Sequence, residues 1–215
     1  MNYRKYTGIV LKKQNYKEAD QIITVWTNQA GKIRVLGKSL RRSQSKLAYS
    51  LQDLSLVDIE LVASKHLPTL VSAQCLKNFK NLREDLSKVG TAFYASELIL
   101  KMTADEHPNH EAFSLLKDFL EYLNKPETKI EKFSPALAAF SLKLLSCLGF
   151  GRPKNSKSAL QLNDYMEALD NHSFVESEKL NIDQVQRRQL HAIISGFIES
   201  VLERHLKSEL FLVSI

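Results

Sequence analysis

The sequence predicts an α+β protein, with an N-terminal five-stranded β barrel in residues 1–80 followed by an all-α helical domain in residues 81–215. Three observations predict this division. The chain of 215 residues is longer than most single domains. Its apolar side chains alternate with a period of two up to about Phe79 and recur with a period of about 3.6 after Asn81. Residues 1–80 carry 14 Lys or Arg against 5 Asp or Glu, whereas residues 81–215 carry 16 against 19.

The first three predicted strands follow from runs of apolar and β-branched residues at 7–13, 21–27 and 32–38. In the third run, Ile33 and Val35 lie on one face, and the opposite face carries Lys32, Arg34 and Lys38. Gly31 precedes this run and supplies the positive φ that a short hairpin loop requires. The second and third strands are therefore expected to pair.

The fourth and fifth predicted strands lie at residues 53–64 and 69–79. In the fourth run, the alternation begins with Leu54 and Leu56 and continues in the opposite phase from Val57. Such a slip indicates a β-bulge, which allows a long strand to bend around the corner of a barrel. Five strands in 80 residues are typical of a small closed barrel.

Four helices are expected after the barrel. The first follows an apparent capping box from Asn81 to Glu84 and ends near Thr103, and the second covers residues 111–124. The third begins with Ser134 as its N-cap and ends at Gly149; because it is apolar almost all round, we expect it at the centre of the helical domain. The last covers residues 183–205.

The first of these helices is expected to face the core with a stripe of apolar residues, Leu86, Val89, Phe93 and Leu100. Residues 151–164 are predicted to form a loop, and residues 165–180 are left open.

The sequence lacks the common catalytic motifs, including phosphate-binding glycine loops and nucleophile elbows. His107 and His110, with Glu106 and Glu111, suggest a metal cluster, but Pro108 makes capping and turn roles the better interpretation. The two cysteines, Cys75 and Cys147, are far apart and favour a reducing cytoplasm. No catalytic residue, cofactor, metal or membrane segment is expected.

The strongest candidate site is a basic segment between the third and fourth strands, Gly37 to Tyr49, which contains no acidic residue. Together with the outer face of the third strand, it predicts a positive stripe for nucleic-acid phosphates. A solvated loop is the alternative interpretation. The cations proposed to bind DNA are Lys32, Arg34, Lys38, Arg41, Arg42 and Lys46. Four aromatic residues near this segment are candidates for stacking on bases: Tyr6, Tyr16, Trp26 and Tyr49. Trp26 is equally suited to a core, and the alternative role of Tyr6 is to seal the end of the barrel.

Several segments resemble RecO, a bacterial family of recombination mediators. The matching residues are Gly8 to Leu11, Tyr16 to Asp20, Gly31-Lys32 with Gly37 to Lys46, Leu82 to Leu86, and Leu144 to Phe150. The resemblance implies an OB-fold barrel followed by a helical domain. Many members of the family carry a four-cysteine zinc site after the Leu-Gly-Phe turn, but Gly151 to Ile215 contains no cysteine. We therefore expect no metal here.

The resemblance also implies a role in the RecF pathway of DNA repair and homologous recombination. A protein of this kind binds single- and double-stranded DNA, anneals complementary strands, and helps load RecA onto DNA coated with single-strand-binding protein. The implied partners are RecR, the C-terminal tail of single-strand-binding protein and, indirectly, RecA, at the nucleoid in the cytoplasm. Two alternatives remain open: an RNA-binding OB module in translation or RNA processing, and a helical scaffold in which the basic segment is incidental.

Overall fold

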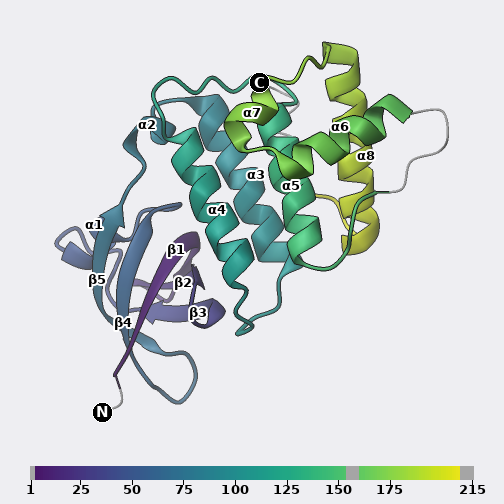
Figure 1. The fold of residues 1–215 in the computed structure, drawn as a ribbon. Helices are drawn as coiled ribbons and strands as arrows, with labels where there is room; N and C mark the ends of the chain where they lie inside the picture. Colours follow the sequence, from purple (N-terminus) through teal and green to yellow (C-terminus); the bar gives the residue numbers. More distant parts are fainter. Residues whose placement is uncertain (1–2, 154–159, 209–215) are drawn as a thin grey trace. The chain divides into compact units, whose positions relative to one another are not determined.

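The computed structural model describes residues 3–153 and 160–208, and the chain divides into two compact units. The first unit contains residues 1–79 together with residues 103–113, and the second contains residues 80–102 and 114–215 (Figure 1). The predicted domain boundary between residues 80 and 81 stays a prediction. The sequence did not indicate one feature of this division: residues 103–113 belong with the barrel.

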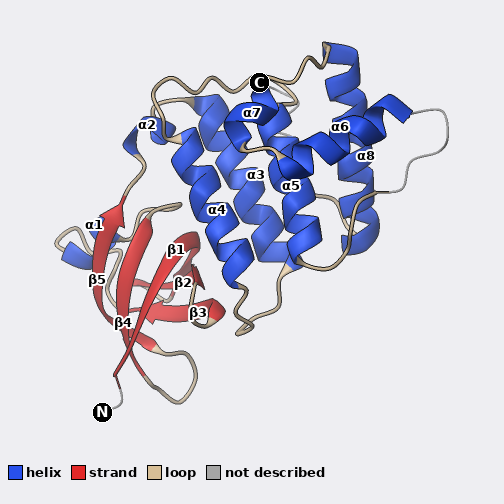
Figure 2. Ribbon diagram, viewed as in Figure 1, coloured by secondary structure: helices blue, strands red, loops and turns tan. Residues whose placement is uncertain are grey.

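The first unit is built on a five-stranded barrel (Figure 2). Its strands are β1 (Tyr3–Tyr16), β2 (Asp20–Thr27), β3 (Gly31–Gly37), β4 (Leu56–Val62) and β5 (Thr69–Lys77), and the short helix α1 (Lys46–Ser50) separates β3 from β4. The barrel closes in the order β1-β2-β3-β5-β4, and β3 and β5 are the one parallel pair in it. This is the closed Greek-key arrangement of an OB-fold, which confirms the predicted fold class.

Two details of the barrel confirm the predictions from local pattern. β2 and β3 pair through a hairpin that closes at Thr27 and Gly31, and Gly31 has a φ of 69°. In β4, consecutive Leu56 and Val57 are both buried, and the pairing with β5 shifts register between them. The predicted bulge therefore lies where the hydrophobic phase changes. Leu54 precedes the strand in a turn with a φ of 65°.

The barrel interior is an apolar cluster drawn from all five strands, and it includes Val10, Val25 and Val35. Trp26 follows Val25, so its side chain points away from that interior. It is nevertheless fully buried, with 0% of its surface exposed. Trp26 is therefore a packing residue and is not available to stack on bases.

The second unit is helical. It contains α2 (Lys80–Arg83), α3 (Leu86–Met102), most of α4 (His110–Leu123), α5 (Pro135–Cys147), α6 (Leu160–Asn171), α7 (Phe174–Glu178) and α8 (Gln184–Leu202). The apolar helix α5 packs against α3, α6, α7 and α8, which confirms its predicted central position. The Ser134 hydroxyl caps its first turn, and Gly149 follows it with a φ of 80°.

Three predictions for the helical part are wrong. Asn81 caps nothing, because α2 is a single turn and the side chain of Asp85 accepts the backbone N–H groups that open α3. Leu86 and Phe93 are 70% and 39% exposed, because α3 buries a face that includes small residues such as Ala92 and Ala95. The loop predicted at residues 151–164 ends early, since α6 begins at Leu160, and its residues 154–159 lie outside the described residues.

Candidate nucleic-acid interface

The basic segment after β3 is held against the turn between β1 and β2. The Asp20 carboxylate accepts a hydrogen bond from the Ser39 N–H at 2.8 Å, and Ser39 has a φ of 54°. The Arg41 N–H donates to the Ala19 carbonyl at 3.0 Å, and Arg41 Nη1 donates to the Glu18 carbonyl at 2.9 Å. These bonds fix the path of the segment on the hairpin.

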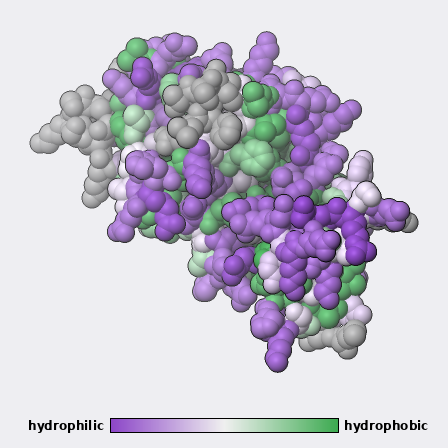
Figure 3. All heavy atoms as spheres, turned by 180° about the vertical axis from the view of Figure 1, so that it is seen from behind, coloured by the Kyte–Doolittle hydropathy of each residue, from purple (hydrophilic) through white to green (hydrophobic). Residues whose placement is uncertain are grey.

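Lys38, Arg41 and Arg42 are exposed on this segment. Within the described residues, no ion pair joins any of the three to a carboxylate, so their charge is not neutralised locally. Figure 3 shows hydrophilic side chains over much of the visible barrel surface. The side chain of Lys46, the last predicted cation, lies outside the described residues, although its backbone begins α1 and Ser45 caps that helix.

The sequence interpretation missed Lys17, which lies at the tip of the β1–β2 hairpin beside this segment. Lys17 is exposed with a φ of 52°, and its ammonium nitrogen lies 5.4 Å from the centre of the Tyr16 ring. The information that identifies Lys17 as part of this surface lies in the register of the paired strands. Tyr16 pairs with Asp20 and Gln21 pairs with Gly37, so the hairpin tip and the start of the basic segment lie at the same end of the barrel. We call Lys17, Lys38, Arg41 and Arg42 the basic rim.

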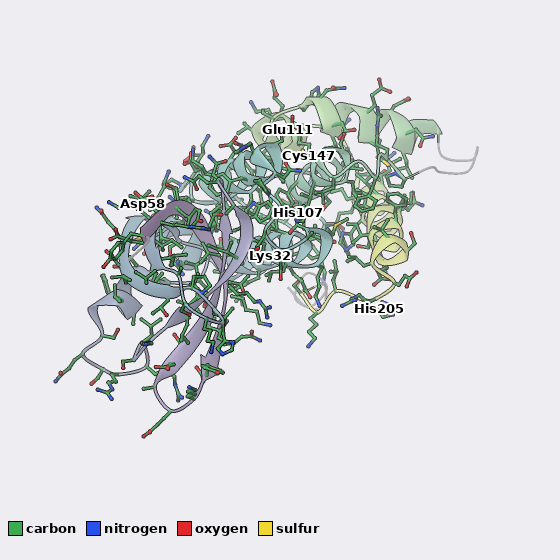
Figure 4. The ribbon with its side chains drawn as sticks, turned by 90° about the horizontal axis from the view of Figure 1, so that it is seen from below. Lys32, Asp58, His107, Glu111, Cys147 and His205 are labelled. Carbon is green, nitrogen blue, oxygen red and sulfur yellow. The ribbon has the colours of Figure 1, made fainter. Side chains whose placement is uncertain are left out.

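The prediction that Lys32 lies on an exposed face is wrong. Its side chain is only 9% exposed, and Lys32 Nζ donates to the Thr103 carbonyl at 2.6 Å and pairs with the Asp105 carboxylate at 3.3 Å. Asp105 also forms a parallel bridge with Lys32, and the Glu106 N–H donates to the Lys32 carbonyl at 2.9 Å. Figure 4 shows Lys32 close to the segment that carries His107. Residues 103–106 therefore cover this part of β3.

Arg34 lies on the same face of β3 as Lys32, but its side chain is 58% exposed. Its guanidinium lies 4.0 Å from the Asp105 carboxylate. Exposed ion pairs of this length contribute little, about 0–1 kcal/mol, so Arg34 remains free to bind a phosphate. Lys32 and Arg34 therefore share a face of β3, as the sequence pattern predicted, but differ in exposure.

His107 and His110 have local partners in the first unit. His107 Nδ1 lies 2.8 Å from the Asp105 carbonyl, and His110 Nδ1 lies 2.8 Å from the Asn28 side-chain oxygen. Among residues 3–153 and 160–208, no group of three His, Cys, Asp or Glu is arranged to hold a metal ion. No helix in the same ranges is long and apolar enough to cross a membrane.

Comparison with known families agrees with this architecture. Residues 1–79 match the model described as Recombination protein O N terminal, and residues 83–161 match the model described as Recombination protein O C terminal. The chain belongs to the RecO family. The zinc site that many RecO proteins carry does not fit this chain, because its cysteines number two and neither follows Phe150.

The relatives of this RecO family member include proteins named DNA repair protein RecO. The chain is 34% identical to the one from Symbiobacterium thermophilum over 143 residues and 33% identical to the one from Alkaliphilus metalliredigens over 145 residues. These alignments cover 66% and 67% of the chain, and they span 55% and 58% of the two relatives. A 27% identical relative from Clostridium perfringens aligns over 94% of both chains.

Proposed function

We propose that this RecO family member is a non-enzymatic DNA-binding mediator of DNA repair and homologous recombination. The observation that carries the proposal is the basic rim, in which four exposed cations lie around a hydrogen-bonded pair of turns. Such a surface binds phosphates without reading bases, and the affinity it supplies is electrostatic. The names of the relatives support a role in repair.

The proposed activity is the annealing of complementary strands. Annealing requires phosphates of two strands to be neutralised on one surface, and a cationic rim that ignores base sequence meets that requirement for single- and double-stranded DNA alike. In the RecF pathway, RecR and the C-terminal tail of single-strand-binding protein would be the direct partners, and RecA would be loaded as a result. We place this activity at the nucleoid in the cytoplasm.

An annealing assay tests the proposal directly. Two labelled complementary oligonucleotides, each coated with single-strand-binding protein, are mixed with the full-length chain, and duplex formation is followed with time. We expect the wild-type chain to accelerate annealing and the variant Arg41→Glu/Arg42→Glu to lose most of that acceleration. The matched control is Lys129→Glu/Lys132→Glu, which makes the same charge change at two exposed lysines outside the basic rim. Equal loss in both variants would contradict the proposal.

The alternative RNA-binding function is separated by comparing DNA and RNA oligonucleotides of one sequence. Proteins that select RNA use its 2′-hydroxyl groups, whereas a surface that binds only phosphates does not distinguish the two strongly. We expect similar affinities for the two strands at equal salt concentration. A marked preference for RNA would contradict the repair function.

A further inference from the structure

A cleft opens in the first unit where the first half of β3 lies away from β5. These two strands pair at Leu36 and Thr69, so residues 31–34 of β3 have no partner in β5. The resulting space has a volume of about 470 Å³. It is bounded by β1, the β2–β3 turn, β3, the loop after β4 and residues 106–108. All of these segments belong to the same compact unit.

The lining of the cleft combines apolar and basic side chains. Ile33 and Leu61 line it and are also members of the barrel core, so they provide an apolar floor. Tyr6, half-buried against that core, and Pro68 supply further apolar surface. Arg4 and Arg34, which are both exposed, also line the cleft, and Arg4 lies opposite Leu61 in the pairing of β1 with β4.

We propose that this cleft binds one unpaired nucleotide of a single DNA strand. The base would lie against Tyr6 and the apolar side chains of the lining, and the adjoining phosphate would lie at Arg4 and Arg34. A planar apolar ring joined to an anion matches this combination of apolar and basic side chains, and the volume is in the usual range of ligand sites, about 300–1,000 Å³. The inference rests on the proposed DNA-binding function and adds a base-binding site to it.

The position of Arg34 connects the cleft with the basic rim. Arg34 and Lys38 are four residues apart on β3 and the turn that follows it, which is about 13 Å of extended chain. A strand whose phosphates lie on the basic rim therefore reaches the cleft along β3. Because a paired base cannot leave its stack without losing its pairing energy, the cleft favours single-stranded over double-stranded DNA.

Glu106 reduces the net positive charge of the cleft lining. It also lines the cleft, so the lining carries two guanidinium groups and one carboxylate. Asp105 lies beside Arg34 as well, at 4.0 Å. The cleft is consequently a weaker anion site than the basic rim, and we expect stacking on Tyr6 to supply most of the binding.

The first test compares two oligonucleotides of equal length, a thymidine strand and a fully abasic strand with the same phosphates. We expect the wild-type chain to bind the thymidine strand about tenfold more tightly, which corresponds to ~1.4 kcal/mol. Tyr6→Leu should bring this ratio close to one, and Tyr6→Phe should preserve it because the ring remains. The control Tyr3→Leu alters an exposed tyrosine of the same strand outside the cleft lining and should leave the ratio unchanged.

The same measurement separates this inference from the proposed function. Arg41→Glu/Arg42→Glu should weaken binding of both strands and retain the ratio, since it removes phosphate contacts alone. A wild-type ratio near one, together with loss of binding in that variant, would overturn the base site and leave the DNA-binding function intact. If Arg41→Glu/Arg42→Glu loses binding of neither strand, the proposed DNA-binding function itself would be overturned.

A second experiment does not depend on how the variants fold. A thymidine strand carrying 5-iodouracil is photocrosslinked to the wild-type chain, and the crosslinked peptide is identified by mass spectrometry. We expect the crosslink at Tyr6. Crosslinks at Tyr16 or Tyr49, both exposed, with none at Tyr6 would overturn the proposal.

Discussion

At the scale of single residues, the structure distinguishes cations that are chemically alike. Lys32 and Arg34 are neighbours on one face of β3, yet Lys32 is buried and Arg34 is exposed. Strand alternation predicted their common face correctly. It could not predict their different exposure, because the residues that cover Lys32, Thr103 to Asp105, come about 70 positions later in the chain.

We predict that Lys32→Met lowers stability and leaves DNA affinity within about twofold of wild type. The substitution removes a buried ammonium and leaves the Thr103 carbonyl without this donor. Loss of a hydrogen bond to a charged group typically costs about 1.5–3 kcal/mol. Denaturant unfolding measures the first effect and fluorescence anisotropy with labelled DNA measures the second. A large drop in affinity with unchanged stability would show that Lys32 binds DNA directly.

Gly31 is required for two separate reasons. Its φ of 69° favours glycine, and a Cβ atom there would lie 2.2 Å from the His107 carbonyl oxygen. The sequence indicated the first reason but contained no signal for the second. Gly31 therefore allows residues 103–113 to approach the β2–β3 turn.

We predict that Gly31→Ala destabilises the chain more than Gly149→Ala does. Gly149 has a similar φ of 80°, but a Cβ atom there would meet nothing within 4 Å. Gly149→Ala, the control, therefore has the backbone strain, about 1 kcal/mol, without the steric clash of the added Cβ atom. The difference in unfolding free energy between the two variants measures the clash. Equal losses would show that residues 103–113 yield to the added methyl group.

At the scale of elements, predictions from local pattern held where a single element determined the outcome. The β2–β3 hairpin, the bulge in β4 and the Ser134 cap of α5 all depend on residues close in the sequence. The face of α3 was predicted wrongly because the apolar stripe was assumed to be buried. Small residues permit close packing with α5, and they carry little of the signal on which hydrophobic periodicity depends.

The α5–α7 contact contains a half-buried acid, Glu178. Burial raises the pKa of Glu178 above its ordinary value of 4.5, although hydrogen bonds from the Ser134 hydroxyl and the Ala136 N–H act in the opposite direction. A raised pKa means that the folded state holds the proton more tightly than the unfolded state does. The ionised carboxylate therefore destabilises the fold at neutral pH, and this effect disappears as pH falls through the folded-state pKa.

We predict that Glu178→Gln raises the melting temperature at pH 8 and that the difference from wild type shrinks as pH approaches 4.5. Glutamine keeps the side-chain oxygen that accepts from Ser134 and Ala136, and it carries no charge to bury. Thermal melts over this range of pH provide the measurement. A difference that stays constant with pH would show that the Glu178 charge does not affect stability.

At the scale of the whole molecule, the excess positive charge lies in the first 80 residues, and four of its exposed cations, the basic rim, lie on two turns at one end of the barrel. The composition alone predicted a basic barrel but not which cations act together. The register of β1, β2 and β3 places Lys17 at the same end of the barrel as the segment that carries Arg41 and Arg42, whereas Lys32 is buried. We propose that the basic rim, together with Arg34, binds the phosphates of DNA.

The salt dependence of binding to single-stranded DNA tests that claim most directly. If about five phosphates are contacted, the logarithm of affinity should fall with the logarithm of salt concentration at a slope of about −3.5. Arg41→Glu/Arg42→Glu removes about two of these contacts, so we predict a slope of about −2 and weaker binding at low salt. The control Lys129→Glu/Lys132→Glu should retain the wild-type slope. A double-variant slope equal to that of wild type would contradict the claim.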